Sequence, residues 1–389
     1  MYHVDDLMRE IRNDPSSFSV KKIEELTQGD PWLRNCALNT YEYIIQADTV
    51  HSYPLDVVLP MTCWCNANCQ FCRYCENQYS YLSLDDLNKY DILLKYVKNF
   101  GFSSYGEPLL HPDFASFAQL VYGKLDPRAT TYLVTNGLLL YKHLNVVKKY
   151  CNSVSISLNA ATSQTHSKIL RLKKDEFINV LNSIKNLVEY RDLYNNKFLI
   201  QLSFVVVKDN IHEIPEFIRL AQKLRVNKIY FNTLNLSYLS DFTPKIRITA
   251  KEYSDIHPSK HPHFNKLYER AVTAIKNAKV SITASPQSWQ SSSLYNNEFT
   301  VSEEFDTLKT VHCSYLYQRL LIADPERIMR TCCFMVHPDG FEKVRYVDSE
   351  SFMEKWNSKG MRAMRKAFAR KKLPQICKVC TLYEKNIFK

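Results

Sequence analysis

LDVVLPMTCWCNANCQFCRYC, residues 55–75, joins a β-rich run to a dense group of cysteines. Cys65, Cys69 and Cys72 form the spacing C-x3-C-x2-C directly after the strand predicted over 55–62. A tight loop with this spacing can present three thiolates to one face of a [4Fe–4S] cluster and leave one iron without a protein ligand. The stretch therefore predicts a strand followed by a cluster-binding loop, with one metal position open to a substrate or cofactor.

The spacing of the cysteines alone also permits two closed sites. Cys63 or Cys75 could complete a zinc knuckle, and four thiolates could hold a closed electron-transfer cluster. Otherwise these two cysteines, like Cys36 and Cys151, are expected to be structural.

Outward from this stretch, helical patterns alternate with β-rich runs. Helices are predicted over 82–100, with Ser83 as the cap, near 113–124, and over 175–191 and 214–224. The further β-rich runs lie at 101–108, 130–137, 153–160, 198–207 and 228–236. Six strands that alternate with helices predict a parallel α/β sheet, either closed into a barrel-like ring or open and doubly wound.

The change of pattern along the chain predicts four parts. Residues 1–53 form an N-terminal helical extension, and residues 54–240 hold the alternating strands and helices. Residues 241–306 form a connecting helix, a short strand and a polar linker, and residues 307–389 form a small α+β domain with a second group of cysteines.

Length and composition exclude several classes of protein. The 389 residues are 45% hydrophobic, which is enough to build a core, and only 7 are glycine, which excludes a collagen-like chain. The opening MYHVDDLMREIRNDP is acidic where a signal peptide needs an apolar core, and no apolar run is long enough to span a membrane. We therefore expect a soluble, cytoplasmic chain with reduced cysteines, whose net charge of +11 favours acidic partners.

The order of motifs resembles the radical S-adenosylmethionine (SAM) superfamily. CNANCQFC follows the first strand, and SYGEPLLHP (104–112) resembles the family's glycine–glutamate–proline segment after the second. VTNG (134–137) ends the third strand and SISLNA (155–160) lies at the fourth. The resemblance implies a partial (β/α)6 TIM-like barrel over most of residues 54–240, and it favours an open cluster over zinc.

The motif residues lie at the carboxyl ends of predicted strands. Ligands of parallel α/β folds bind at that end, where glycine lets the backbone approach closely. The resemblance implies SAM contacts for Gly106 and Glu107 at the methionyl amine, Ser157 and Asn159 at the ribose, and Thr135 and Asn136 nearby. Ordinary strand-end polarity explains Ser157 and Asn159 as well, and a turn explains Thr135 and Asn136.

The chemistry implied by the resemblance needs SAM and a [4Fe–4S] cluster held by Cys65, Cys69 and Cys72. An electron from the cluster would break the C5′–S bond, and the 5′-deoxyadenosyl radical would remove hydrogen from an unactivated C–H bond. A reducing partner such as flavodoxin or ferredoxin would supply the electron. Neither a membrane nor a nucleic acid is expected as a partner.

A second group of cysteines occupies the C-terminal part of the chain. Cys313, Cys332, Cys377 and Cys380 suit a fully ligated cluster or a structural zinc ion. The layout resembles the twitch or SPASM-type auxiliary domain of radical SAM enzymes, which implies an auxiliary [4Fe–4S] cluster. Cys333 could replace Cys332 as a ligand, serve as a catalytic thiol near the substrate, or be buried and inert.

Two other patterns have simple interpretations. The helix predicted over 351–372 carries apolar residues at helical spacing that suit a core, and its basic residues, Arg365 among them, form a predicted solvated face. His257, His261 and His263 suggest a metal site, but no acidic pattern accompanies them.

Family resemblance does not name a substrate. Auxiliary-domain enzymes of this kind modify ribosomally made peptides by crosslinking, oxidation or epimerisation, and we expect a peptide substrate first. The alternative is a small polar metabolite such as a sugar or aminoglycoside, which would be dehydrogenated or epimerised. The alternative of another class is a non-catalytic iron–sulfur or zinc protein.

Overall fold

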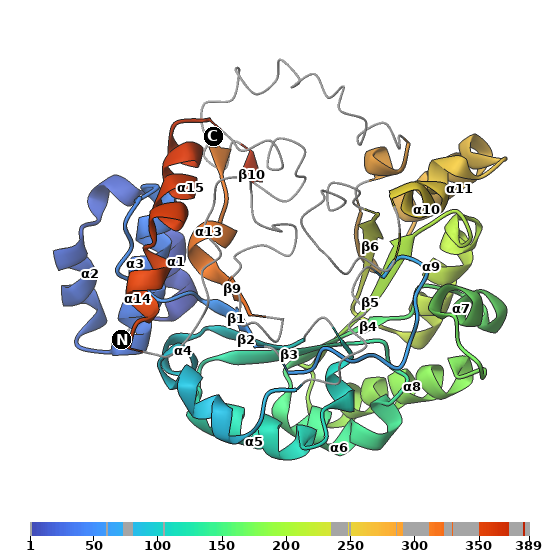
Figure 1. Ribbon diagram of the computed structural model, residues 1–389, viewed down its shortest axis with the longest axis horizontal. Coiled ribbons are helices and arrows are strands. Elements are labelled where there is room, and N and C mark those ends of the chain that lie inside the picture. Colours follow the sequence, from blue (N-terminus) through green and yellow to red (C-terminus); the bar gives the residue numbers. More distant parts are fainter. Residues whose placement is uncertain are drawn as a thin grey trace.

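The computed structural model is built around one curved parallel sheet. It describes residues 2–59, 61–72, 81–103, 106–234, 248, 250–284, 286–290, 311–322, 329, 350–372 and 384–385. Eight strands among these residues pair in the order β7–β6–β5–β4–β3–β2–β1–β9, every neighbouring pair parallel (Figure 1). They are β1 (Asp56–Val58), β2 (Asn99–Phe102), β3 (Thr130–Thr135), β4 (Ser153–Ser157), β5 (Leu199–Val206), β6 (Lys228–Thr233), β7 (Ser281–Thr283) and β9 (Arg319–Leu321).

Helices cover the convex side of this sheet, as Figure 1 shows. They are α4 (Asp91–Tyr96), α5 (Phe114–Lys124), α6 (Leu140–Tyr150), α7 (Ser163–Leu170), α8 (Phe177–Tyr194) and α9 (Ile214–Leu224). The strand residues that face these helices are apolar and fully buried, for example Phe100, Leu133 and Phe204. Because side chains alternate along a strand, the residues between them face the concave side.

The concave face is polar over its described middle strands. The side chain of Gln201 donates to Ser155 Oγ at 3.0 Å, and that of Asn232 donates to Ser203 Oγ at 2.6 Å. Each pair joins two neighbouring strands through uncharged groups. This face therefore offers hydroxyl and amide groups to anything bound against it.

The predicted parallel α/β fold of partial-barrel type is confirmed. The helix predicted over 214–224 has those bounds as α9. The helix predicted over 82–100 is too long: Ser83 Oγ does accept from Asp86 N at 3.1 Å, but a 3-10 helix (Asp85–Tyr90) and α4 end it at Tyr96. β2 then begins at Asn99, because alternation places Phe100 and Phe102 together in the core.

Strands also come from outside the segment predicted to form the barrel. β7 pairs with β6, and β9 pairs with β1 on the other side of the sheet. Residues 281–283 belong to the predicted connecting segment and residues 319–321 to the predicted auxiliary domain. The domain boundaries themselves stay predictions.

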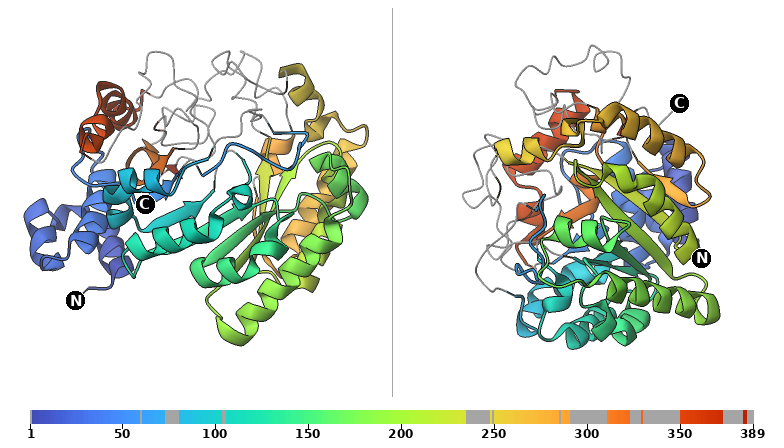
Figure 2. Two further views of the ribbon diagram at one scale, coloured as in Figure 1. Left: turned by 60° about the horizontal axis from the view of Figure 1, so that its bottom comes forward. Right: turned by 90° about the vertical axis from the view of Figure 1, so that its right-hand side faces the viewer.

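The remaining elements lie at the two ends of the curved sheet (Figure 2). Toward the β1 end lie α1 (Val4–Asn13), α2 (Val20–Thr27), α3 (Pro31–Ile44), α13 (Tyr315–Gln318), α14 (Phe352–Trp356) and α15 (Lys359–Ala369). Toward the β7 end lie α10 (Ala250–Asp255) and α11 (Phe264–Lys276). A short antiparallel pair joins β8 (Val311–His312) to β10 (Glu384–Lys385). Within the described residues, no helix combines the length and apolar character that crossing a bilayer requires.

Arg365 on α15 is fully buried, so its predicted place on a solvated face is wrong. Its guanidinium donates to the carbonyl oxygens of Leu316 and Trp356, both at 3.1 Å. It also donates to Asn357 Oδ1 at 3.2 Å. The Asn357 side chain in turn accepts from Val50 N through Oδ1 and donates to Val50 O through Nδ2. Burial lowers the pKa of Arg365 to about 10, so the side chain stays charged near neutral pH. It therefore ties the C-terminal helices to the segment after α3.

We predict that Arg365→Ala lowers the free energy of unfolding by about 3–5 kcal/mol, because backbone acceptors would lose their donor inside the protein. Denaturant titration of the full chain measures this change. Arg362→Ala, at an exposed position of the same helix, is the matched control and should be nearly neutral. Equal stability of the two variants would contradict the structural role of Arg365.

Candidate functional site

The three cysteines of the C-x3-C-x2-C spacing lie in the loop that follows β1, at the carboxyl edge of the sheet. Cys65, Cys69 and Cys72 are partly buried, and Cys63 beside them is buried. Cys65 Sγ accepts from the backbone N–H of Ala67 at 3.5 Å, and Cys72 N donates to Cys69 O at 3.0 Å. The loop thus turns back on itself and keeps its thiols in one region. Cys75 lies outside the described residues.

The backbone at Gly106 passes directly against this loop. Gly106 N donates to Thr62 O at 3.2 Å, and Glu107 N donates to Trp64 O at 2.8 Å. A Cβ atom at position 106 would lie 2.1 Å from the carbonyl oxygen of Trp64, closer than any side chain tolerates. Only glycine therefore permits the connection after β2 to hold the start of the cysteine loop.

The carboxylate of Glu107 links the ends of β2 and β3. It is 2% exposed, and it accepts from Thr135 Oγ1 at 2.6 Å and from Asn136 N at 2.8 Å. Burial raises its pKa to about 7, while these hydrogen bonds and one from Leu109 N act in the opposite direction. The carboxylate therefore has an internal structural role, and its contact with a methionyl amine stays a prediction.

Asn136 joins the end of β3 to the cysteine loop. Its side-chain amide donates to Asn66 Oδ1 at 2.8 Å and lies 3.7 Å from Cys65 Sγ. The next residue, Gly137, has a left-handed φ of 81°, and its N–H donates to Thr135 Oγ1. Thr135 and Asn136 thus form the turn at the end of β3 and, through the same hydrogen bonds, also contact the cysteine loop and Glu107.

Ser157 and Asn159 lie at the end of β4, next along the same edge. Ser157 is half-buried on the concave face, whereas Asn159 is buried with a left-handed φ of 59°. The Asn159 amide donates to Ser157 O at 3.0 Å and accepts from Val205 N at 2.7 Å. Asn159 therefore uses its side chain to join β4 to β5, and the ribose contacts of both residues stay predictions.

The chemistry of the cysteine site fits an iron–sulfur cluster. Burial, together with smaller contributions from the nearby Glu107 and Cys72, raises the pKa of Cys65 to about 12. A thiolate at this position therefore needs a positive partner, which the iron of a cluster provides. Among the described residues, no three His, Cys, Asp or Glu side chains are arranged to share a single metal ion.

Of the second cysteine group, Cys313 alone lies in the described part of the chain. It follows β8 and is partly buried against the core. Cys332, Cys333, Cys377 and Cys380 lie outside the described residues. The auxiliary cluster and the catalytic role of Cys333 therefore stay predictions.

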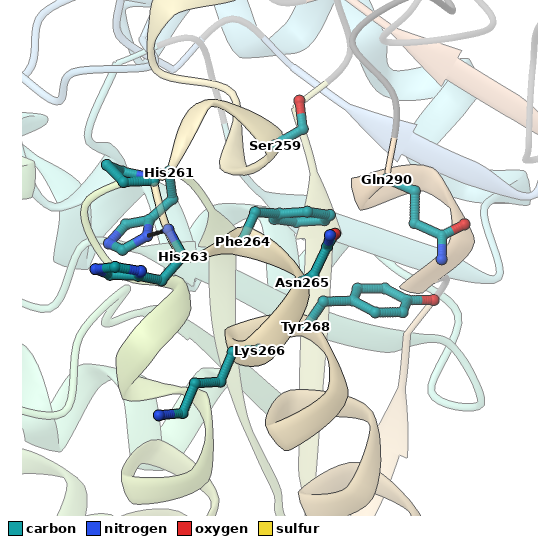
Figure 3. A pocket seen from close by; sticks show the side chains of 9 residues that line it. Ser259, His261, His263, Phe264, Asn265, Lys266, Tyr268 and Gln290 are labelled. Atoms are coloured by element: carbon teal, nitrogen blue, oxygen red, sulfur yellow. Dashed lines mark hydrogen bonds between the residues drawn. The ribbon is translucent and has the colours of Figure 1, made fainter.

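A separate pocket of about 670 Å³ involves two of the three histidines singled out in the sequence. His261 and His263 line it together with Phe264, Tyr268 and Gln290, at the start of α11 (Figure 3). His257 is buried outside this lining. Because the described residues hold no three-ligand metal set, a metal site at these histidines gains no support.

The sequence interpretation missed His111 as a support of the site. Its Nε2 lies 2.7 Å from Leu82 O, and its Nδ1 accepts from Asp113 N at 3.1 Å. These contacts make Nε2 the protonated nitrogen and fix the chain where it returns from the cysteine loop. Its place four residues after Glu107, in a segment already singled out, was the available signal.

We predict that Gly106→Ala prevents stable iron binding by the cysteine loop, because the new Cβ atom and the Trp64 carbonyl cannot both be accommodated. Iron per chain after anaerobic reconstitution is the measurement. Gly123→Ala on α5 is the matched control, since a Cβ atom there meets nothing within 4 Å. Wild-type iron content in the Gly106 variant would contradict the close approach.

Comparison with curated proteins finds relatives for about half of the chain. Over 214 residues it is 31% identical to the probable GTP 3′,8-cyclase of Saccharolobus islandicus strain M.14.25, covering 52% of this chain and 62% of that protein. Over 211 residues it is 23% identical to the GTP 3′,8-cyclase of Aquifex aeolicus, covering 52% and 63%. The chain thus spans less than two thirds of the length of these relatives.

Solved structures share the fold over more of the chain. Streptococcus suis SuiB, bound to its precursor peptide SuiA, matches with a TM-score of 0.56 and 14% identity, over 90% of this chain and 75% of that one. The anSMEcpe structure with bound AdoMet and Cp18Cys peptide matches with a TM-score of 0.51 and 16% identity, over 84% and 86%.

The model of the radical SAM superfamily matches residues 59–221. This range begins at the end of β1 and includes the cysteine loop, Glu107, Asn136 and Asn159. The chain therefore carries a radical SAM domain over these residues.

Proposed function

We propose that this chain is a radical SAM enzyme that removes a hydrogen atom from an unactivated C–H bond of a peptide. The observation that carries the proposal is the cysteine loop with its partly buried thiols at the carboxyl edge, held by Gly106 and Asn136 and matched by the family model. When bound, the cluster and SAM supply the 5′-deoxyadenosyl radical. The proposed setting is the cytoplasm, with flavodoxin or ferredoxin as the reducing partner.

The chain's own residues would hold the cofactors and exclude water. Cys65, Cys69 and Cys72 would bind the cluster, and Asn136 restrains Cys65 through its amide. Glu107 holds the ends of β2 and β3 together, so the edge on which SAM would lie is rigid. The concave face beyond this edge would orient the substrate.

A peptide suits the chemistry of the concave face. Ser155, Gln201, Ser203 and Asn232 present hydroxyl and amide groups, which can pair with the N–H and C=O groups of a peptide backbone. SuiB and anSMEcpe, which share the fold, were each solved with a bound peptide. A sugar or aminoglycoside would use the same groups through its hydroxyls and is the alternative within this class.

The sequence relatives favour a second candidate, a GTP 3′,8-cyclase. A triphosphate substrate would need several cationic side chains near the site. On the described concave face the cations Lys228 and Arg319 are the first residues of β6 and β9, away from the carboxyl edge, and Arg319 lies 3.6 Å from Asp56. The peptide proposal is therefore preferred, and GTP belongs in the same assay.

We predict that Cys65→Ala, Cys69→Ala and Cys72→Ala each abolish 5′-deoxyadenosine formation from SAM in the reconstituted, dithionite-reduced protein. Each variant removes one of the three ligands that the cluster requires. Chromatographic detection of 5′-deoxyadenosine is the measurement, and Cys36→Ala, a buried thiol of α3, should retain activity. Production of 5′-deoxyadenosine by a loop variant would refute the proposal.

We predict that Cys377→Ala retains part of SAM cleavage but loses product, because a proposed auxiliary cluster would accept an electron from the substrate radical. Iron near eight per chain would indicate two [4Fe–4S] clusters, and iron near four would leave the C-terminal cysteines to zinc or to no metal. Deuterium transfer into 5′-deoxyadenosine from labelled peptides, aminoglycosides and GTP identifies the substrate class. Normal turnover of the Cys377 variant would show that its redox role is wrong.

A further inference from the structure

The half of the cysteine loop that carries Cys69 is attached to the C-terminal end of α7. Asn68 N donates to Leu170 O and Gln70 N donates to Ile169 O, both at 2.9 Å. The last carbonyl groups of an α-helix have no partner inside the helix. The backbone N–H groups of the loop therefore bind the free carbonyl groups at the end of α7, and these hydrogen bonds hold the loop and the helix together.

The side chain of Gln70 extends this attachment to a third segment. Its Nε2 donates to Lys168 O at 3.3 Å and to Asp209 Oδ2 at 3.2 Å, in the connection between β5 and α9. Lys168 Nζ lies 3.0 Å from the same carboxylate oxygen. Lys168 O and Asp209 Oδ2 can only accept hydrogen bonds, so the Gln70 side chain must direct its NH2 group, and not its oxygen, toward them. Gln70 thus joins the cysteine loop, α7 and the β5–α9 connection.

Apolar packing supports the same contact. Ile169 and Leu170 are fully buried and form a cluster with Val207. Cys69 and Phe71 pack against this cluster from the loop. The second half of the loop, beyond the residues that Gly106 and Asn136 contact, is therefore held by hydrogen bonds and by apolar contacts together.

The other end of α7 is fixed to the edge where the nucleoside of SAM is predicted to bind. Thr162 caps the helix by accepting from Thr165 N at 3.3 Å, and its hydroxyl donates to Glu213 at 2.6 Å. Glu213 also accepts from Ala161 N at 2.6 Å, two residues after Asn159. The eight residues of α7 therefore connect the chain that follows Asn159, at the end of β4, to the cysteine loop.

We propose that Gln70 is a positioning residue, which holds the Cys69–Cys72 half of the loop on α7 so that the three thiolates converge on one cluster and that cluster is aligned with SAM. The proposal rests on the function proposed above. Gln70 would contact neither SAM nor substrate and would act through α7 and Asp209. The proposal concerns the side chain of Gln70 and no other side chain of the loop.

The first test uses the full chain without metal. Hydrogen exchange in a peptide spanning 61–72 should be faster in Gln70→Ala than in the wild type, because the loop loses two side-chain contacts. Gln222→Ala on α9 is the matched control, since its side chain binds Lys279 N away from the loop. Unchanged exchange in the Gln70 variant would overturn the attachment, whatever the chain catalyses.

The second test uses the reconstituted, reduced protein and SAM as the probe. SAM should change the EPR spectrum of the wild-type cluster, and Gln70→Ala should need at least ~10-fold more SAM for the same change. Gln70→Glu should be worse, because it places a second carboxylate beside Asp209, and the double variant Q70E/D209N should recover part of the response. Asp209→Asn alone keeps an acceptor for Gln70 and should stay close to the wild type.

The outcomes separate the two proposals. A wild-type cluster that does not respond to SAM refutes the proposed function. A wild-type cluster that responds, together with Gln70→Ala and Gln70→Glu variants of the same SAM dependence, refutes the role of Gln70 alone. If Gln70→Ala unfolds, the comparison of Gln70→Glu with the double variant decides, and an absence of recovery counts against the proposal.

Discussion

The backbone of Gly106 and the carbonyl group of Trp64 approach so closely that no side chain fits between them. This contact brings the connection after β2 onto the first residues of the cysteine loop, and Glu107 and Asn136 extend it to β3. The second half of the loop is held by α7 and Gln70. A loop with partly buried thiols is costly to order by itself, and here hydrogen bonds to three separate parts of the sheet edge offset that cost.

The sequence predicted the order of strands and helices because each strand has its own apolar pattern. It did not predict β9, because the partner of β9 is β1, and no local pattern at residues 319–321 indicates a pairing with so distant a segment. The burial of Arg365 was missed for a related reason: its acceptors are carbonyl groups of Leu316 and Trp356, which only the folded chain brings around it. The helix over 82–100 was extended too far because the helical pattern runs into the first residues of β2 without a break in polarity.

The sequence predicted which residues belong to the candidate site, but it did not predict which groups those residues contact. Spacing and family resemblance identified Cys65, Glu107 and Asn136, and the structure places all three at one edge of the sheet. The resemblance assigned Glu107 and Asn159 to the ligand, which stays a prediction, and the structure adds that both side chains bind protein groups. The direction in which a side chain points at the end of a strand depends on the neighbouring connection, which the sequence does not specify. For the same reason Gln70 could not be recognised as a support, and His111 was missed although it lies in a segment already singled out.

The position of β9 has a consequence for the order in which this protein is assembled. β1 leads into the cysteine loop, and in the finished sheet it has a neighbour on both sides, β2 and β9. During synthesis on the ribosome, β9 emerges long after the cysteines of the loop. Until then β1 is an exposed edge strand, open to pairing with another nascent chain. The strand that leads into Cys65, Cys69 and Cys72 therefore has both of its sheet neighbours only after translation has passed residue 321.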